Sequence, residues 1–149
     1  MIVREAELWD VPALFGLAEK FHGEATLRFP LPNAEAIYRT ILETKRFSEI
    51  CCFVAEDKEI FGFIVGVVSR LPHSFYMIGT ETMFFIEKKE RGGTAAKLLL
   101  RHFTDWCWGT GVKFVSCGSI SGIKEERYGK FLEKLGFRWA GAAYIKEKQ

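Results

Sequence analysis

The 149-residue sequence lacks the features that mark several large classes of protein. None of its four cysteines belongs to a C-x-x-C pair, which argues against a structural zinc site and predicts no metal. The first residues contain no signal-peptide apolar run, and the longest apolar stretch, 60–68, is far too short to span a membrane. We therefore expect a cytoplasmic protein with reduced thiols and no membrane partner.

The sequence also has no excess of charge of one sign. Lys and Arg number 21 against 19 Asp and Glu, giving a net charge of +2, and the basic residues alternate with acidic ones, as in 87–91 and 124–127. A dedicated nucleic-acid binder usually shows a clustered basic excess, so nucleic acid is not an expected partner. The G-x-G-x-x-G and Walker A phosphate-binding patterns are absent as well.

Apolar residues, in contrast, are plentiful. Hydrophobic residues make up 48% of the chain and charged residues 27%, which is typical of a soluble globular protein. The length predicts a single domain over 1–149 with a hydrophobic core large enough to need no stabilising metal or disulfide. Aromatics reach 15%, and they can pack the core, line a cleft for a bulky ligand, or cover an interface.

Periodicity and turn residues predict ten elements in the order β-α-α-β-β-β-α-β-α-β. We expect strands at 2–4, 51–55, 60–68, 75–86, 112–119 and 139–146, and helices capped by Asp10 and Asn33, followed by helices at 94–108 and 124–135. Phe29–Pro32 ends the first helix, and Gly136 follows the last. This order predicts a mixed α/β sheet with an antiparallel meander and a parallel crossover near its end.

The segment around Arg91-Gly92-Gly93 carries the clearest chemical signal. It joins a strand to a helix, and the free N–H groups at a helix N-terminus favour a phosphate or pyrophosphate. The two glycines allow close approach of the backbone, and Ala95 and Ala96 leave the first turn open. A plain glycine turn before a helix explains these residues equally well.

At this segment the chain resembles the GNAT superfamily of N-acetyltransferases, whose motif is Q/R-x-x-G-x-G/A. Arg91–Ala96 begins with the Arg and ends with the Ala, although Thr94 stands at the usual glycine. Further similar segments lie in family order over nearly the whole chain, at 3–14, 54–64 and 131–137. The Arg-Gly-Gly variant and the short C-terminus are most similar to family members encoded by bacteriophages.

The resemblance implies a GNAT-like mixed sheet with splayed central parallel strands, and acetyl-CoA as the acyl donor. In the family, N–H groups of the fourth strand bind pantetheine and the acetyl oxygen. By position these groups belong here to Phe84, Phe85 and Ile86. The pyrophosphate would rest on the turn opened by Arg91, on the N–H groups of Gly92, Gly93, Thr94, Ala95 and Ala96.

The resemblance also suggests catalytic groups. Glu81 is spaced like a family glutamate that helps to deprotonate the amine through a water, although a solvated strand glutamate is an equally good interpretation. The family's tyrosine acid is missing, because Leu132 stands at its position. Tyr128, one helical turn earlier, can partly substitute, but a role as a core aromatic is favoured.

The acceptor amine is expected near the loop after the first helix. His22 and Glu24 can bind or deprotonate it there, beside Arg28 and Phe29, although polar surface residues at a helix end are the favoured interpretation. Neither His73 nor His102 is a strong catalytic candidate. Cys117 lies beside the expected thioester site without an evident His partner, so a cysteine nucleophile is not expected.

These observations predict an acetyl-CoA-dependent N-acetyltransferase in which a primary amine attacks directly in a ternary complex. The alternative is a GNAT-fold protein that has lost catalysis and acts as a CoA-binding or protein-interaction module. The acceptor can be a small molecule or a protein, and a homodimer is left open. The compartment would be the bacterial cytoplasm, or that of the bacterial host if a phage encodes the chain.

Overall fold

The computed structural model describes residues 1–26, 30–118 and 121–148. It contains a five-stranded sheet in the order β1-β2-β3-β4-β5. The elements along the chain are β1 (Ile2–Glu5), a 3-10 turn η1 (Leu8–Asp10), α1 (Val11–Glu24), α2 (Ala34–Arg46), β2 (Ile50–Glu56), β3 (Ile60–Arg70), β4 (Met77–Ile86), a 3-10 turn η2 (Lys88–Glu90), α3 (Ala95–Gly109), β5 (Phe114–Ser116) and α4 (Glu125–Lys134).

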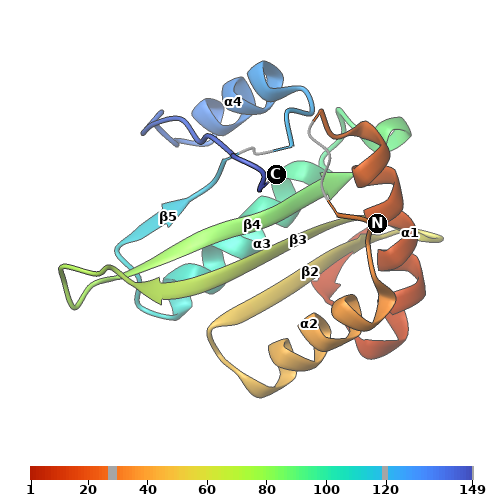
Figure 1. The fold of residues 1–149 in the computed structure, drawn as a ribbon, viewed down its shortest axis with the longest axis horizontal. Helices are drawn as coiled ribbons and strands as arrows, with labels where there is room; N and C mark the ends of the chain where they lie inside the picture. The colour runs from red at the N-terminus through yellow and green to blue at the C-terminus, as the bar shows by residue number, and fades with distance from the viewer. Residues whose placement is uncertain (27–29, 119–120, 149) are drawn as a thin grey trace.

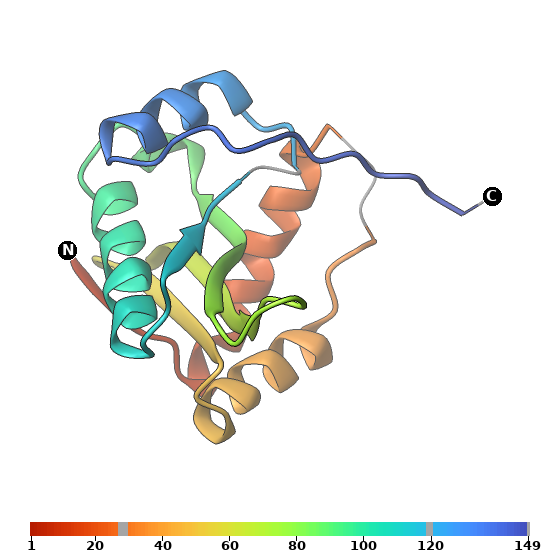
Figure 2. The same ribbon diagram turned by 90° about the vertical axis from the view of Figure 1, so that its left-hand side faces the viewer.

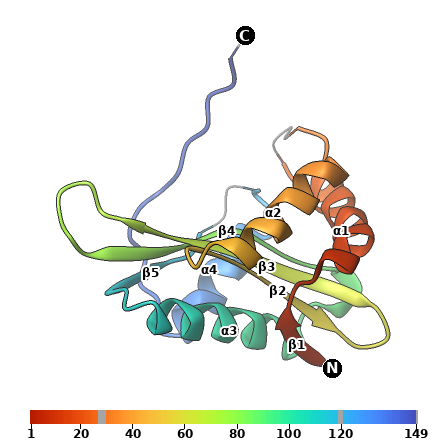
Figure 3. The ribbon, with the colours of Figure 1, turned by 90° about the horizontal axis from the view of Figure 1, so that it is seen from below.

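Helices cover both faces of the sheet (Figure 1). Helices α1 and α2 lie on one face, and α3 and α4 lie on the other (Figure 3). Strands β1 to β4 pair antiparallel in sequence order, and β5 pairs parallel with β4. This arrangement confirms the predicted meander and the parallel crossover. In the described residues no helix is both long and apolar enough to cross a membrane.

Most helix termini follow the sequence signals, although α1 ends at Glu24, before its predicted end at Phe29–Pro32. The Asn33 side chain accepts the Ala36 N–H at 3.1 Å and caps α2, and Gly136 follows α4 at φ +91°. Asp10 precedes α1 but does not cap it with its side chain. Its carboxylate instead accepts from Arg4 at 2.7 Å and from the Glu7 N–H at 2.7 Å, because a cation and the η1 turn lie within its reach.

Helix α3 buries one stripe of side chains against the sheet. Its buried members are Ala95, Leu99, Leu100, Phe103 and Cys107, whereas Leu98, His102 and Trp106 are only half-buried. The sheet accommodates this stripe with glycine. A Cβ on Gly66 would lie 2.1 Å from the Phe103 ring, and one on Gly79 would lie 2.4 Å from Cys107 Sγ. The helix can therefore pack close to β3 and β4.

The predicted last strand, 139–146, is wrong for the structure, because 137–148 form neither helix nor strand. This tail leaves the body of the molecule (Figure 2), with Trp139 80% and Tyr144 93% exposed. Between those aromatics the sequence is Ala-Gly-Ala-Ala, which has low strand propensity and little side chain to bury. Strand β5 is also shorter than predicted and not buried, since Phe114 is 58% exposed. Ser119, its predicted end, lies outside the described residues.

Candidate active site

A β-bulge in β4 sets which side chains of the strand face which helices. Val65 pairs with Met83 and Gly66 with Glu81, so Thr82 is an extra residue in β4. Its hydroxyl donates to the Val65 carbonyl at 3.1 Å. Bulges are common beside active sites, where they re-aim side chains.

The bulge shifts by one residue the alternation of β4 side chains between the two faces of the sheet. Before it, Gly79 and Glu81 face α3 and α4, as their contacts with Cys107 and Tyr128 indicate. After it, Phe84 packs on that same side, whereas Phe85 joins the cluster on the α1 side. Three of the predicted cofactor-binding positions, Phe84, Phe85 and Ile86, lie in this second part of β4.

Strands β4 and β5 pair up to Thr80 and separate from Glu81 onward. Their pairing covers only Ile78–Thr80 against Phe114–Ser116, although β4 continues to Ile86. After β5 the chain turns away from β4 toward α4 (Figure 1). The predicted splay of the central parallel strands is therefore present. Within residues 1–26, 30–118 and 121–148, the backbone of β4 from Glu81 onward has no strand partner on this side.

The Glu81 carboxylate makes hydrogen bonds across the gap where the two strands separate. Its Oε2 accepts a hydrogen bond from the Tyr128 hydroxyl at 3.2 Å and another from the Gly118 N–H at 3.3 Å. Burial raises the pKa of Glu81 to about 7, against the opposing effect of these two hydrogen bonds. A carboxyl with a pKa near neutrality is suited to accept a proton and release it again.

Tyr128 lies between this carboxylate and an aromatic cluster. Its ring centroid is 5.7 Å from that of Phe84 and 6.4 Å from that of Phe131. Burial, together with the negative charge of Glu81, raises the pKa of Tyr128. The structure thus brings together both predicted catalytic residues, which are 47 positions apart in the sequence. Leu132 is 8% exposed and belongs to the main core cluster.

The glycine turn lies between β4 and α3, as the sequence predicts. Gly92 has φ +92°, a conformation that favours glycine, and a Cβ on Gly93 would make only an ordinary contact with the Glu90 carbonyl oxygen, at 3.8 Å. Thr94 precedes α3 without a side-chain capping hydrogen bond, and the first helical bond runs from the Leu98 N–H to its carbonyl. Helix α3 therefore presents free N–H groups in its first turn, beside buried Ala95 and half-buried Ala96.

The Arg91 side chain is directed into the protein. Its Nε donates to the Ile86 carbonyl at 2.7 Å, its Nη1 lies 2.8 Å from Glu24 Oε2, and its guanidinium lies 5.3 Å from the Phe85 ring centroid. Phe85 in turn makes an edge contact with Phe21 at 5.9 Å. A predicted cofactor residue and a predicted acceptor residue therefore form one ion pair, which fastens the end of α1 to the turn.

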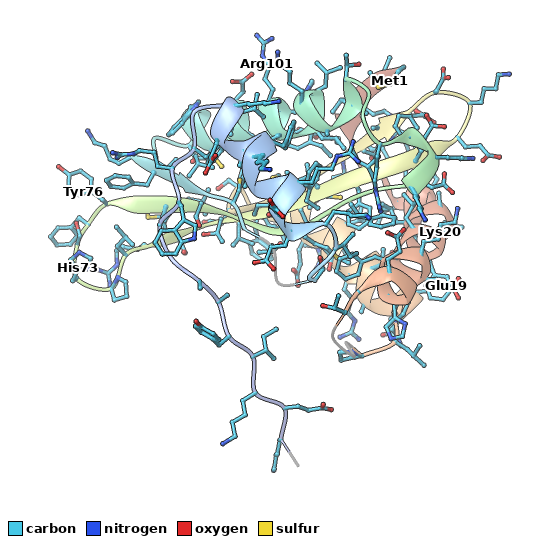
Figure 4. The ribbon with its side chains drawn as sticks, turned by 90° about the horizontal axis from the view of Figure 1, so that it is seen from above. Met1, Glu19, Lys20, His73, Tyr76 and Arg101 are labelled. Carbon is cyan, nitrogen blue, oxygen red and sulfur yellow. The ribbon has the colours of Figure 1, made fainter. Side chains whose placement is uncertain are left out.

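The other sequence candidates lie at different distances from this region. His22 is half-buried on the last turn of α1, near Glu24. Arg28 and Phe29 lie outside the described residues. His73, in the turn after β3, lies at the opposite end of the molecule from Lys20 of α1 (Figure 4). The half-buried Cys117 follows β5, and burial raises the pKa of its thiol, which disfavours a nucleophilic thiolate.

Sequence reasoning misses three residues of this region. The bulge at Thr82 has no sequence signal of its own, and the Gly118 N–H acts through the backbone, which any residue type could supply. Arg127 directly precedes Tyr128 and lies beside the glycine turn. Its position next to a candidate catalytic residue on a short helix is the one signal that could have indicated it.

Comparison with known proteins identifies the fold. No protein-family model matches the sequence, and a search of curated proteins found no match. An acetyltransferase from Trypanosoma brucei is similar with a TM-score of 0.76 and 18% identity, over 99% of both chains. Glucosamine-6-phosphate N-acetyltransferase from Arabidopsis thaliana gives 0.78 and 16%, over 99% of this chain and 98% of the other.

A third similar structure is AAC(6')-Iy in complex with a bisubstrate analogue, CoA-S-monomethyl-acetylneamine. Its TM-score is 0.77 at 14% identity, over 99% of this chain and 97% of the other. These similarities show that the chain has the fold of the GNAT acetyltransferases, which confirms the predicted fold class.

Proposed function

We propose that this chain is an N-acetyltransferase that transfers the acetyl group of acetyl-CoA to a primary amine in a ternary complex. The observation that carries the proposal is the hydrogen-bonded pair of Glu81 and Tyr128 at the point where β4 and β5 separate. A half-buried acid and a phenol in contact, in a fold of this class, are suited to moving protons during acyl transfer.

The acyl donor would lie along the second part of β4 and reach the glycine turn. Unpaired N–H groups among Phe84, Phe85 and Ile86 would hold the pantetheine arm and polarise the thioester carbonyl. The N–H groups from Gly92 to Ala96 would receive the pyrophosphate. The Arg91 side chain would hold this turn in position through its hydrogen bond to the Ile86 carbonyl and its ion pair with Glu24.

The chemical step needs a neutral amine. The ionised Glu81 carboxylate takes one proton from the ammonium form of the acceptor, directly or through a water, and the neutral amine nitrogen then forms a bond to the acetyl carbon. As the tetrahedral intermediate collapses, the carbon–sulfur bond breaks, the electron pair leaves with sulfur, and the nitrogen loses its second proton. Tyr128 can relay that proton to the thiolate by giving up its own proton and taking the one from nitrogen, and a thiolate is also a tolerable leaving group without an acid.

The acceptor would bind between the end of α1 and the bulge of β4. His22 and Glu24 are the acceptor-binding residues we propose, with Glu24 acting mainly by holding Arg91. Two of the similar structures carry names or ligands of amino-sugar chemistry. For this chain we propose only a primary amine, on a small molecule or on a protein.

The proposal is tested by cofactor binding and turnover together. We expect acetyl-CoA to raise the melting temperature and the protein to acetylate members of a panel of primary amines, with Glu81→Gln losing turnover while keeping cofactor affinity. A flat thermal shift at millimolar acetyl-CoA would contradict the proposal. Unchanged turnover in Glu81→Gln would remove Glu81 from the mechanism.

A second candidate function is a non-catalytic module that binds CoA or a protein. The observation that favours it is Leu132, which fills the core at the position of the family's tyrosine. Cofactor binding without transfer to any amine of the panel would support this candidate. A cytoplasmic location, a homodimer and a bacteriophage origin stay predictions that rest on the sequence.

A further inference from the structure

A cation outside the family motif lies directly over the glycine turn. Arg127 Nη2 is 3.6 Å from the position that a Cβ on Gly92 would occupy. The two residues belong to different elements, since Gly92 precedes α3 and Arg127 lies in the first turn of α4. The guanidinium and the first turn of α3 therefore border the same space from two sides.

The Arg127 guanidinium has no protein partner among residues 1–26, 30–118 and 121–148, where no hydrogen bond or ion pair involves it. Two other cations at this turn are paired with carboxylates. Arg91 pairs with Glu24 at 2.8 Å, and Lys89 lies 3.5 Å from Glu87. Arg127 is thus an exposed arginine beside the turn whose charge no carboxylate of the described residues neutralises.

The start of α4 explains why Arg127 lies there. Lys124, which precedes the helix, has φ +47°, an uncommon conformation for a residue with a side chain. The Tyr128 N–H then donates to the Lys124 carbonyl at 2.9 Å. Successive side chains on a helix point in directions about 100° apart. Tyr128 can therefore reach Glu81 while Arg127 lies against the turn.

We propose that Arg127 is a phosphate-binding residue that holds the diphosphate of CoA against the α3 N-terminus. This inference rests on the proposed function and extends it to a residue of α4. A guanidinium can donate two parallel hydrogen bonds to phosphate oxygens, which free N–H groups of a helix complement from the other side. Because Gly92 has no side chain, the guanidinium can approach the backbone of the turn closely.

The test is the dissociation constant of CoA by calorimetry, for the unmodified protein and for Arg127→Ala, Arg127→Lys and Lys130→Ala. Lys130 is the matched control, because it lies on the same helix and pairs with Glu126 at 3.2 Å. We expect Arg127→Ala to weaken CoA binding roughly tenfold, Arg127→Lys to recover part of the loss, and Lys130→Ala to change little.

Dephospho-CoA serves as the second probe, because it keeps the diphosphate and lacks the 3′-phosphate. We expect the same roughly tenfold loss with it. Equal affinities of Arg127→Ala and the unmodified protein, or equal losses in Arg127→Ala and Lys130→Ala, would overturn the inference alone. A loss with CoA but not with dephospho-CoA would overturn the diphosphate assignment. Failure of the unmodified protein to bind CoA would overturn the proposed function and this inference with it.

Discussion

The Tyr128 hydroxyl donates to the Glu81 carboxylate over 3.2 Å and so connects α4 to β4. The contact forms where β5 has already separated from β4, so these two side chains and the Gly118 N–H join elements that the sheet no longer joins. Both the chemistry we propose and the local stability of the sheet edge therefore depend on one carboxyl group.

The pH dependence of turnover is expected to follow Glu81. Only the ionised carboxylate can accept the amine proton, so turnover at saturating substrates falls as the pH decreases through the raised pKa of about 7. Glu81→Gln should lose activity roughly a hundredfold or more near pH 8, with no such titration remaining. Initial rates from pH 5.5 to 9 measure both effects, and a profile in Glu81→Gln that parallels the unmodified one would contradict the assignment.

The stability of the unliganded protein should depend on the same group in the opposite sense. The folded-state pKa of Glu81 lies above its ordinary value, so the folded state holds its proton more tightly than the unfolded state. The stabilisation from the protonated form is full at pH values below the unfolded pKa, and it is lost as the pH rises toward the folded pKa.

Glu81→Gln mimics the protonated group and keeps an acceptor for Tyr128 and Gly118. It should therefore raise the melting temperature at pH 8 by roughly 2–4 °C, with little change at pH 4.5. Thermal denaturation of both proteins at the two pH values measures the difference. A uniform shift at both values would indicate an effect unrelated to ionisation.

The ion pair of Arg91 and Glu24 should couple the acceptor side to the cofactor turn. Arg91→Ala and Glu24→Ala are each expected to destabilise the protein, and the double variant should lose less than the sum, with a coupling of about 0.5–2 kcal/mol. Urea denaturation of the four proteins completes the cycle. Arg39→Ala is the control, because its pair with Glu35 is on the exposed surface of α2 and should contribute little.

The close approach of α3 to the sheet predicts opposite effects for two glycine substitutions. Gly66→Ala would place a methyl group against the Phe103 ring and should destabilise by about 1–3 kcal/mol. Gly16→Ala, on α1 with open space around it, should stabilise by about 0.5–1 kcal/mol. Chemical denaturation of both variants measures this contrast, and equal effects would contradict the packing described for β3 and α3.

Local signals in the sequence predict much of this fold. Asn33 caps α2 through its side chain, and Gly136 takes the positive φ that ends α4. Such features depend on a few adjacent residues. The prediction of a last strand at 139–146 was wrong for a nonlocal reason, because a strand forms only beside a partner. The Ala-Gly-Ala-Ala stretch has little side chain to bury against β5.

In the candidate site, too, the sequence predicts local features but not contacts between distant residues. Glu81 and Tyr128 were each identifiable as candidates, but their contact depends on where β5 separates from β4 and on the direction of α4, neither of which a spacing rule contains. The pairing of Arg91 with Glu24 likewise depends on where α1 ends relative to β4. The sequence predicted a phosphate turn there, and the structure adds that its leading arginine also holds the neighbouring helix.

The extra residue in β4 has a consequence for how this strand tolerates genetic change. Replacing Thr82 would leave the alternation of its neighbours intact, because the strand would keep the same number of residues. Deleting one codon at this position would make Glu81 and Met83 adjacent, as their partners Gly66 and Val65 already are, so Phe84 would still face Tyr128 and Phe85 would still face Phe21. This strand could therefore lose its extra residue without exchanging the sides that its two rings face.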